Sequence, residues 1–181
     1  MIVNNVDFEI AFTNAFGDLN RVSLASIHDN RLRFELAGDL EETQSRIREA
    51  IERSTDILTY CFKNREVLLR ILLWDDNAVE LLEKLIIGTD HQAERTRDLE
   101  SECDMLYVKM KKYDEFIGNY IKELKIHHDM AIEPSANITC YYINFEIPVV
   151  INIYDDRGMD VFSTNFEFIN DLRLNFLKWI L

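Results

Sequence analysis

The spacing of apolar residues divides the chain into a series of helices and strands. Phe8, Phe12 and Phe16 recur at helical spacing and predict a short helix over residues 4–17. Over residues 31–39, apolar and charged side chains alternate, which is the pattern of a strand with one face in water. The first predicted elements are therefore one helix and one strand.

The most regular element that the pattern predicts is a helix after residue 38. Asp39 and Glu42 have the spacing of a capping box, with Asp in place of the usual Ser or Thr, and predict its N-terminus. One continuous stripe then runs along it: Ile47, Ala50, Ile51, Ser54, Ile57, Leu58, Cys61 and Phe62. Residues 66–74 are apolar almost without a break, as in a central strand covered on both faces, and residues 77–88 predict a second helix.

The second half of the chain becomes progressively richer in β-forming residues. Residues 89–104 are polar and predict a loop or an exposed helical turn. The further predicted elements are a strand (105–113), a helix (114–130), three strands (137–146, 148–154 and 159–164) and a terminal helix (166–181). We therefore expect a single domain over residues 1–181 with an α+β fold. Its sheet is expected to be mixed or mainly antiparallel, with about five to six strands, helices packed against it and a β-hairpin near the C-terminus.

Composition and charge narrow the classes of partner. Hydrophobic residues at 48% and charged residues at 29% are ordinary for a globular protein. A net charge of −13 repels phosphate backbones, so we expect no nucleic-acid partner. No stretch approaches the roughly 18 apolar residues of a membrane span, and the N-terminus lacks the pattern of a signal peptide, so we expect a cytoplasmic protein without membrane contact. Residues 74–104 carry ten acidic and three basic residues; they form either a solvated face or a docking surface for a basic partner.

Local signatures of catalysis and metal binding are missing from the sequence. The three cysteines form no CxxC pair, and Cys61 and Cys140 fall on apolar patterns that predict buried free thiols. His127 and His128 are adjacent on a predicted helix and would point about 100° apart, which prevents both from binding one ion from the same face. No Gly-rich phosphate loop, nucleophile elbow or HExxH motif occurs. We therefore expect no cofactor, no metal site and no catalytic residue.

The segment YDDRGMD, residues 154–160, is the most concentrated cluster of charge between two predicted strands. Asp155 can accept backbone hydrogen bonds as in an Asx-turn, Arg157 can pair with Asp155 or Asp160, and Gly158 is expected to supply the positive φ of a hairpin turn with a bulge. Structure therefore accounts for much of this turn. Two functional interpretations stay open, a metal or catalytic site and a partner-binding site formed by Tyr154, Asp155, Asp156, Arg157 and Asp160.

Two further features have alternative interpretations. Arg70 interrupts the apolar run 66–74, and a buried arginine must pair, with Glu35 or Glu146 on neighbouring strands as candidates. The alternative is an anion-binding arginine, and the geometry of a pocket decides between them. The terminal helix over 166–181 is apolar on more than one side, so it is either buried within the monomer or a homodimer contact.

Three segments together resemble a known family. RFELAG at residues 33–38, YDDRGMD at residues 154–160 and the terminal WIL at residues 179–181 are similar to an uncharacterised bacterial family, domain of unknown function 3885. The turn is the most specific of the three segments. The resemblance implies no activity, because that family has no assigned function.

The hypothesis that we carry forward is a non-enzymatic, acidic protein-binding module. One version of it is an inhibitor or immunity-type protein that covers a basic partner, with charge complementarity accelerating association. The alternative is a small enzyme or ligand-binding protein with a cleft near Asp155–Asp160. A third interpretation is a self-assembling protein, with a homodimer joined through the terminal helix.

Overall fold

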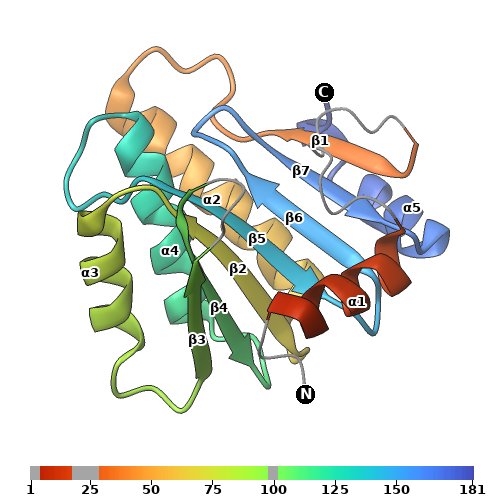
Figure 1. Cartoon of the computed structure of the whole chain (residues 1–181). Coiled ribbons are helices and arrows are strands. Elements are labelled where there is room, and N and C mark those ends of the chain that lie inside the picture. Colours follow the sequence, from red (N-terminus) through yellow and green to blue (C-terminus); the bar gives the residue numbers. More distant parts are fainter. Residues whose placement is uncertain (1–4, 18–28, 98–101) are drawn as a thin grey trace.

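Seven strands and five α-helices make up the part of the chain described by a computed structural model, residues 5–17, 29–97 and 102–181 (Figure 1). The elements are α1 (Asn5–Phe16), β1 (Arg31–Glu35), α2 (Thr43–Phe62), β2 (Val67–Leu73), α3 (Asp76–Ile86), β3 (Gln92–Arg97), β4 (Asp104–Met110), α4 (Glu115–Asp129), β5 (Ile138–Asn144), β6 (Val149–Ile153), β7 (Gly158–Ser163), α5 (Phe166–Asn175) and the 3₁₀ turn η3 (Leu177–Trp179). The strands form one sheet in the order β1-β7-β6-β5-β2-β4-β3, and every pairing is antiparallel. The expected α+β fold with an antiparallel sheet is confirmed.

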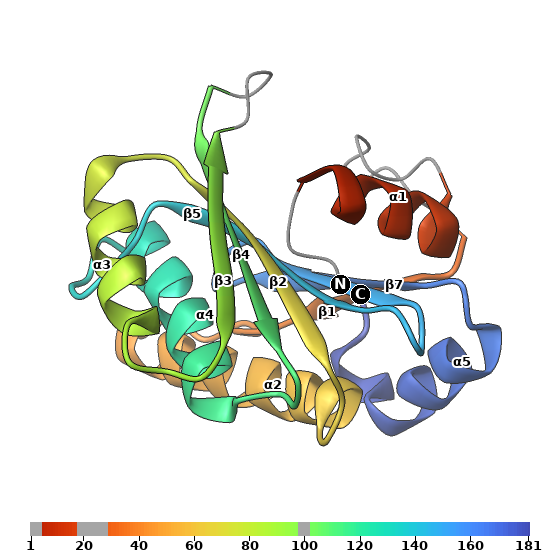
Figure 2. The same cartoon turned by 60° about the horizontal axis from the view of Figure 1, so that its bottom comes forward.

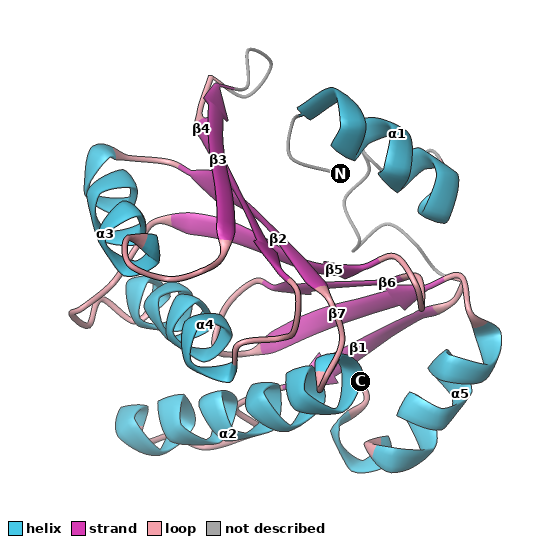
Figure 3. Cartoon of the chain, turned by 90° about the horizontal axis from the view of Figure 1, so that it is seen from below, coloured by secondary structure: helices cyan, strands magenta, loops and turns pink. Residues whose placement is uncertain are grey.

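The two faces of the sheet are covered differently. Helices α2, α3, α4 and α5 pack on one face, and α1 lies alone on the other (Figures 2 and 3). Alternation along β2 shows how the sequence produces this division, because Leu69 and Ile71 belong to the core under the four helices while Leu68 belongs to the cluster under α1. We call these surfaces the four-helix face and the α1 face.

The N-terminal helix is held to the sheet by its predicted aromatic stripe. Phe8, Phe12 and Phe16 are all buried and contact one another along α1. They cover a row of apolar side chains from four neighbouring strands: Leu68, Ile143, Val150 and Phe162. Contacts between Phe8 and Tyr107 and between Phe16 and Phe162 show that α1 crosses the strands from β4 to β7.

The helix after β1 begins slightly later than its sequence signal suggested. Glu42, rather than Asp39, is the N-cap of α2, and its carboxylate accepts hydrogen bonds from the backbone N–H groups of Gln44 (3.0 Å) and Ser45 (2.6 Å). A carboxylate at the N-cap satisfies N–H groups that have no partner within the helix. The predicted stripe of α2 is otherwise correct, since its members are buried apart from the half-buried Ile51.

The predicted loop over residues 89–104 was wrong, because residues 92–97 form the edge strand β3. The sheet therefore has seven strands rather than five to six. Along β3, exposed and half-buried side chains alternate, and four of its six residues are exposed. An edge strand with so little buried surface has no need of apolar side chains. Its sequence therefore lacked the signal by which strands are recognised.

The terminal helix is shorter than predicted. Helix α5 ends at Asn175, and after η3 the chain reaches the outer edge of β1. There the backbone N–H of Leu181 donates to the carbonyl of Arg33 (2.9 Å), and Ile180 forms an isolated bridge with Phe34. The C-terminus therefore covers one edge of the sheet, which local helical periodicity could not reveal.

Two expectations from the sequence, one about buried thiols and one about membrane-spanning segments, can be compared directly with the fold. The prediction that Cys61 and Cys140 are buried free thiols is confirmed, and burial raises the pKa of both thiols. Among the described residues, no helix is both long enough and apolar enough to cross a membrane.

A charged side chain is buried between α2 and α4. Lys122 is 1% exposed, and its ammonium group donates hydrogen bonds to the carbonyl of Ile51 (3.0 Å) and to the hydroxyl of Thr55. Burial lowers the pKa of Lys122 to about 8, although Glu123 and Asp56 act in the opposite direction. A change from 10.5 to about 8 corresponds to roughly 3 kcal/mol.

Lys122→Met should be more stable than the wild type at about pH 7, because an apolar side chain of similar length removes the cost of burying the charge. Between about pH 8 and the ordinary lysine pKa of 10.5 the unfolded chain binds more protons at this residue than the folded chain, so this contribution to wild-type stability rises with pH. Urea unfolding of both proteins should therefore show the advantage of the variant shrinking toward about pH 10. An advantage that is constant over this range would contradict the assignment.

Candidate functional site

The turn between β6 and β7 is built around Asp155. Its Oδ1 accepts hydrogen bonds from the backbone N–H groups of Arg157 (2.8 Å) and Gly158 (3.2 Å). Its Oδ2 accepts from the Arg157 guanidinium, with 2.7 Å to Nε. The predicted Asx-turn and the predicted pairing of Arg157 with Asp155 are both confirmed. Arg157 points outward, since 76% of its side chain is exposed, while Asp155 is buried.

The other two aspartates of the turn region are paired with arginines from other elements. Asp156 accepts from Nε of Arg46 on α2 at 3.1 Å. Asp160 accepts two hydrogen bonds from Arg33 on β1, at 3.0 Å from Nε and 3.1 Å from Nη2, and lies 3.5 Å from Nη1 of Arg31. Both carboxylates are buried. The turn therefore connects β7 to a helix and to the neighbouring strand through two ion pairs.

Gly158 is required for a different reason from the one that the sequence suggested. Its φ is not positive, so the expected bulge geometry is wrong. A Cβ at this position would instead lie 2.9 Å from the carbonyl oxygen of Phe34 and would overlap the hydroxyl of Tyr154. The Tyr154 ring is in turn covered by the Arg33 guanidinium at 5.5 Å. Close packing of three strands, rather than backbone conformation, accounts for the glycine.

The pairing limits the chemistry that these residues can perform. Each of Asp155, Asp156 and Asp160 is neutralised by a different arginine, so the three carboxylates do not converge on one point. Among the described residues, no group of three or more histidine, cysteine or acidic side chains is arranged to hold a metal ion. Of the five predicted site residues, Arg157 is the outward group available for a partner, while the aspartates hold the turn in place.

Asp160 also belongs to a row of polar side chains that crosses the whole sheet. The strand registers align one residue from each strand, in the order Arg33, Asp160, Asn152, Tyr141, Arg70, Tyr107 and Glu94. Residues directly opposite one another on antiparallel strands share a face. Tyr107 and Tyr141 belong to the cluster under α1, so this polar row lies on the α1 face.

Arg70, in the middle of the polar row, does not have the predicted ion pair. Glu35 lies near Arg53 instead, at 3.8 Å, and no carboxylate of the described residues pairs with Arg70. Its guanidinium carbon is 5.2 Å from the centre of the Phe8 ring and 6.0 Å from that of Tyr141. Its Nε is buried and has no hydrogen-bond acceptor in the part of the chain that the structure describes. Of the two alternatives drawn from the sequence, the ion pair is therefore wrong.

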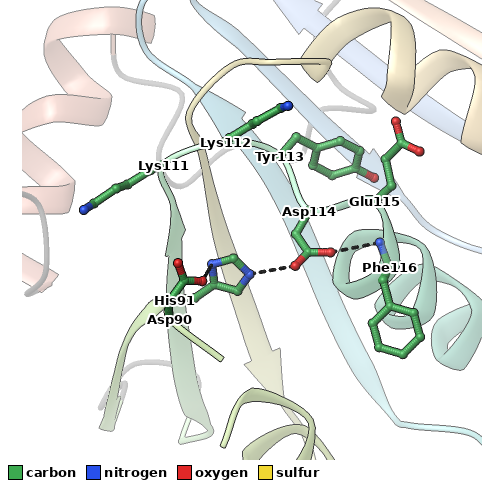
Figure 4. Close-up of a pocket in the computed structure, with 8 residues that line it drawn as sticks. All are labelled: Asp90, His91, Lys111, Lys112, Tyr113, Asp114, Glu115 and Phe116. Atoms are coloured by element: carbon green, nitrogen blue, oxygen red, sulfur yellow. Dashed lines mark hydrogen bonds and ion pairs between the residues drawn. The ribbon is translucent and has the colours of Figure 1, made fainter. Parts of the chain in front are cut away.

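A cavity of about 510 Å³ lies on another part of the molecule, where the start of β3 meets the N-terminus of α4 (Figure 4). His91 Nε2 lies 3.0 Å from Oδ2 of Asp114, and the other oxygen of Asp114 accepts from the backbone N–H groups of Phe116 (3.0 Å) and Ile117 (3.2 Å). Burial acts to raise the pKa of Asp114, but the Ile117 N–H and the His91 ring hold it below its usual value. Since both oxygens are engaged, this pair fixes β3 against α4.

A second, apolar groove lies between α3 and β3 on the four-helix face. It has a volume of about 280 Å³ and is lined by Glu83, Ile86, Ile87, Ala93, Arg95 and Leu106. Ile87 is 78% exposed, and Glu83 pairs with Arg95 at 2.7 Å across the groove. Apart from Leu106, the residues that line the groove belong to the acid-rich segment 74–104.

Sequence reasoning missed both cavities and the polar row for related reasons. His91 and Asp114 are 23 residues apart, and a pairing at that distance depends on the strand that was predicted as a loop. The polar row depends on the register of all seven strands, which apolar patterns do not specify for polar residues. The one local sign of the polar row in the sequence was Arg70 itself, a charged residue within an otherwise apolar segment.

The fold and these sites define an antiparallel α+β domain with one helix-rich face and one face covered by a single helix. The chain belongs to the family described as domain of unknown function (DUF3885), whose sequence model matches residues 8–181. No curated protein and no solved structure matches the chain. The resemblance seen in the sequence is thus confirmed, and it assigns no activity.

Gly158→Ala should destabilise the protein by about 2–3 kcal/mol, because the added methyl group must displace the backbone at Phe34 or the ring of Tyr154. Urea unfolding of Gly158→Ala, Tyr154→Phe and the double variant gives the coupling between the two residues. We expect the double variant to lose less than the sum of the single variants, since Tyr154→Phe removes one of the clashing atoms. Strict additivity would show that the hydroxyl is not in the way.

Proposed function

We propose that the protein is a non-enzymatic, cytoplasmic binding module for a basic protein, and that the partner docks at the apolar groove between α3 and β3. The observation that carries this proposal is the groove itself, in which the exposed Ile87 stands beside the more buried Ile86 and Leu106. An exposed aliphatic side chain beside a groove of this kind can serve as an anchor for a partner surface.

Charge around the groove favours a basic partner. Asp76, Glu80 and Glu83 follow one another at helical spacing along one stripe of α3, and Ile87 is the C-cap residue of that helix. The Glu80–Lys84 pair is fully at the surface, with both side chains about 70% exposed. Surface pairs of this kind contribute only about 0–1 kcal/mol, so a partner's lysine or arginine can replace Lys84. A net charge of −13 adds long-range attraction for a basic protein.

The edge strand beside the groove offers further contacts. β3 pairs with β4 on one side, and no backbone hydrogen bond joins its outer edge to another described residue. Free N–H and C=O groups on an edge strand can pair with an extended segment of a partner. An inhibitor or immunity-type protein, which covers its partner tightly, is one form that such a module takes.

The turn over residues 154–160 stays a predicted partner contact of this module. Arg157 is its outward side chain, while Tyr154 and the three aspartates support the loop. The alternative function is an activity in a cleft at the same turn. That activity would use the polar row to which Asp160 belongs.

Affinity capture from host lysate with matched baits tests the groove. The wild type should retain one stoichiometric basic protein at low salt and release it at high salt. Ile87→Glu should lose that protein, because it places a charge at the apolar anchor. Ile10→Glu is the control, since Ile10 is also exposed, at 58%, but lies on α1 on the other face. Retention by Ile87→Glu, or binding that does not weaken with salt, would count against the proposal.

Self-association through the C-terminal segment is a second candidate arrangement. Leu174, Leu177 and Leu181 are 73%, 63% and 70% exposed. Residues 166–181 contain two acidic and two basic residues, so this segment is neutral in a chain of net charge −13. Two copies can therefore meet here without the charge repulsion that opposes contact elsewhere.

Sedimentation velocity tests this arrangement with one substitution and one control. The wild type should sediment as a dimer of the 21.4 kDa chain, and Leu177→Glu should sediment as a monomer because a charge replaces an apolar contact. Ile87→Glu should remain dimeric, since it lies on α3. A monomeric wild type at the highest concentration measured excludes the dimer.

A further inference from the structure

We propose that Arg70 is the centre of an anion-binding site on the α1 face, and that it takes a ligand carrying a carboxylate or phosphate group. This site is separate from the protein-docking groove. Leu106 of the groove belongs to the core under the four helices, whereas the neighbouring Tyr107 lies beside Arg70 on the opposite face. The anion site therefore goes beyond the proposed function and does not depend on it.

The first observation is the contrast between Arg70 and the arginines at the turn. Arg33, Arg46 and Arg157 each donate to an aspartate, so their charges are balanced within the fold. Arg70 has no such partner among the described residues. It is only partly exposed, and its Nε is buried with no acceptor.

An arginine in this state is costly unless something else binds it. Leaving a buried charged donor without an acceptor costs free energy, because the group has lost water and gained no hydrogen bond. The rings of Phe8 and Tyr141, at 5.2 and 6.0 Å, attract the guanidinium charge but provide no oxygen for Nε. An external anion would supply the missing acceptor.

The shape of the guanidinium specifies the chemical class of that anion. Its N–H groups form a planar fork that matches two oxygen atoms of a carboxylate or phosphate. Aromatic rings limit the orientations of the fork, since Phe8 and Tyr141 lie near it. A preorganised fork loses less conformational freedom on binding than a mobile side chain does.

The neighbours of Arg70 in the polar row leave its positive charge uncompensated. Tyr141 and Tyr107 are the residues directly opposite it, and neither is an acid. Asp160 and Glu94 lie farther along the row; Asp160 is already paired with Arg33, and among the described residues no ion pair joins Glu94 to Arg70. Burial raises the pKa of the Tyr141 hydroxyl and the charge of Arg70 acts to lower it, as expected if the guanidinium field reaches that hydroxyl. Protonated Tyr141 is thus a neutral donor beside the site.

Helix α1 supplies one wall of the site. Figure 1 shows α1 lying across the strands in front of the sheet, and Phe8 near its N-terminal end is the residue over Arg70. Phe8 is 1% exposed and also contacts the Tyr107 ring at 5.2 Å. A ligand with an apolar or aromatic group next to its anion would therefore meet an aromatic surface.

Thermal unfolding in the presence of phosphate or acetate, at constant ionic strength, tests the site. A ligand that binds only the folded state raises Tm as it saturates the site, by roughly 5–10 °C at about 100-fold its Kd. Arg70→Met should abolish the rise and Arg70→Lys should weaken it, because lysine keeps the charge without the fork. Arg48→Met, at an exposed arginine on α2 that belongs to none of the proposed sites, is the control that should respond like the wild type.

The Nε–H resonance of Arg70 in an NMR titration with the same two anions provides the second measurement. A saturable shift with phosphate alone would assign a phosphate-bearing ligand, and a shift with acetate alone would assign a carboxylate; either supports the site. Equal Tm rises in the wild type and Arg70→Met would overturn it. The absence of a saturable response to both anions in both measurements would overturn it too.

Discussion

Alternation of side chains along antiparallel strands is the constraint on which the rest of this structure depends. Because successive residues face opposite sides, one register of seven strands fixes both a continuous core under four helices and a second surface under α1. A slip of one residue in β2 would bring Arg70 into the core and expose Leu69 and Ile71. The strong apolar pattern of the central strands therefore also determines where the charged residues lie.

Ion pairs neutralise the charged residues to different extents in different parts of the molecule. The turn over residues 154–160 looks reactive in the sequence, but each of its aspartates meets a separate arginine, and the result is a stable connection between β1, β7 and α2. Arg70 shows the opposite case, a charge in an apolar segment whose Nε has no hydrogen-bond acceptor among the described residues. Density of charge in a sequence is thus a poor indicator of which charged groups the fold leaves without a counter-charge.

Most of the elements could be predicted from the sequence, because the buried face of a helix or strand gives a periodic pattern of apolar residues. The stripe of α2 and the apolar runs of β2 and β6 were correct since each faces a core. β3 was missed because it lies at an edge, and the extent of α5 was overestimated because apolar residues continue into the segment that covers β1. The groove and the polar row were the least predictable features, since the groove combines residues of a helix and two strands and the row combines residues of seven strands.

Mapping the docked surface directly is the measurement that tests the central claim most closely. Amide hydrogen exchange should be compared between the free protein and its complex with the captured basic partner. Docking at the groove predicts added protection in β3 and at residues 86–87, with little change in α1. Protection confined to α1 or to residues 166–181 would place the partner elsewhere and contradict the proposed function.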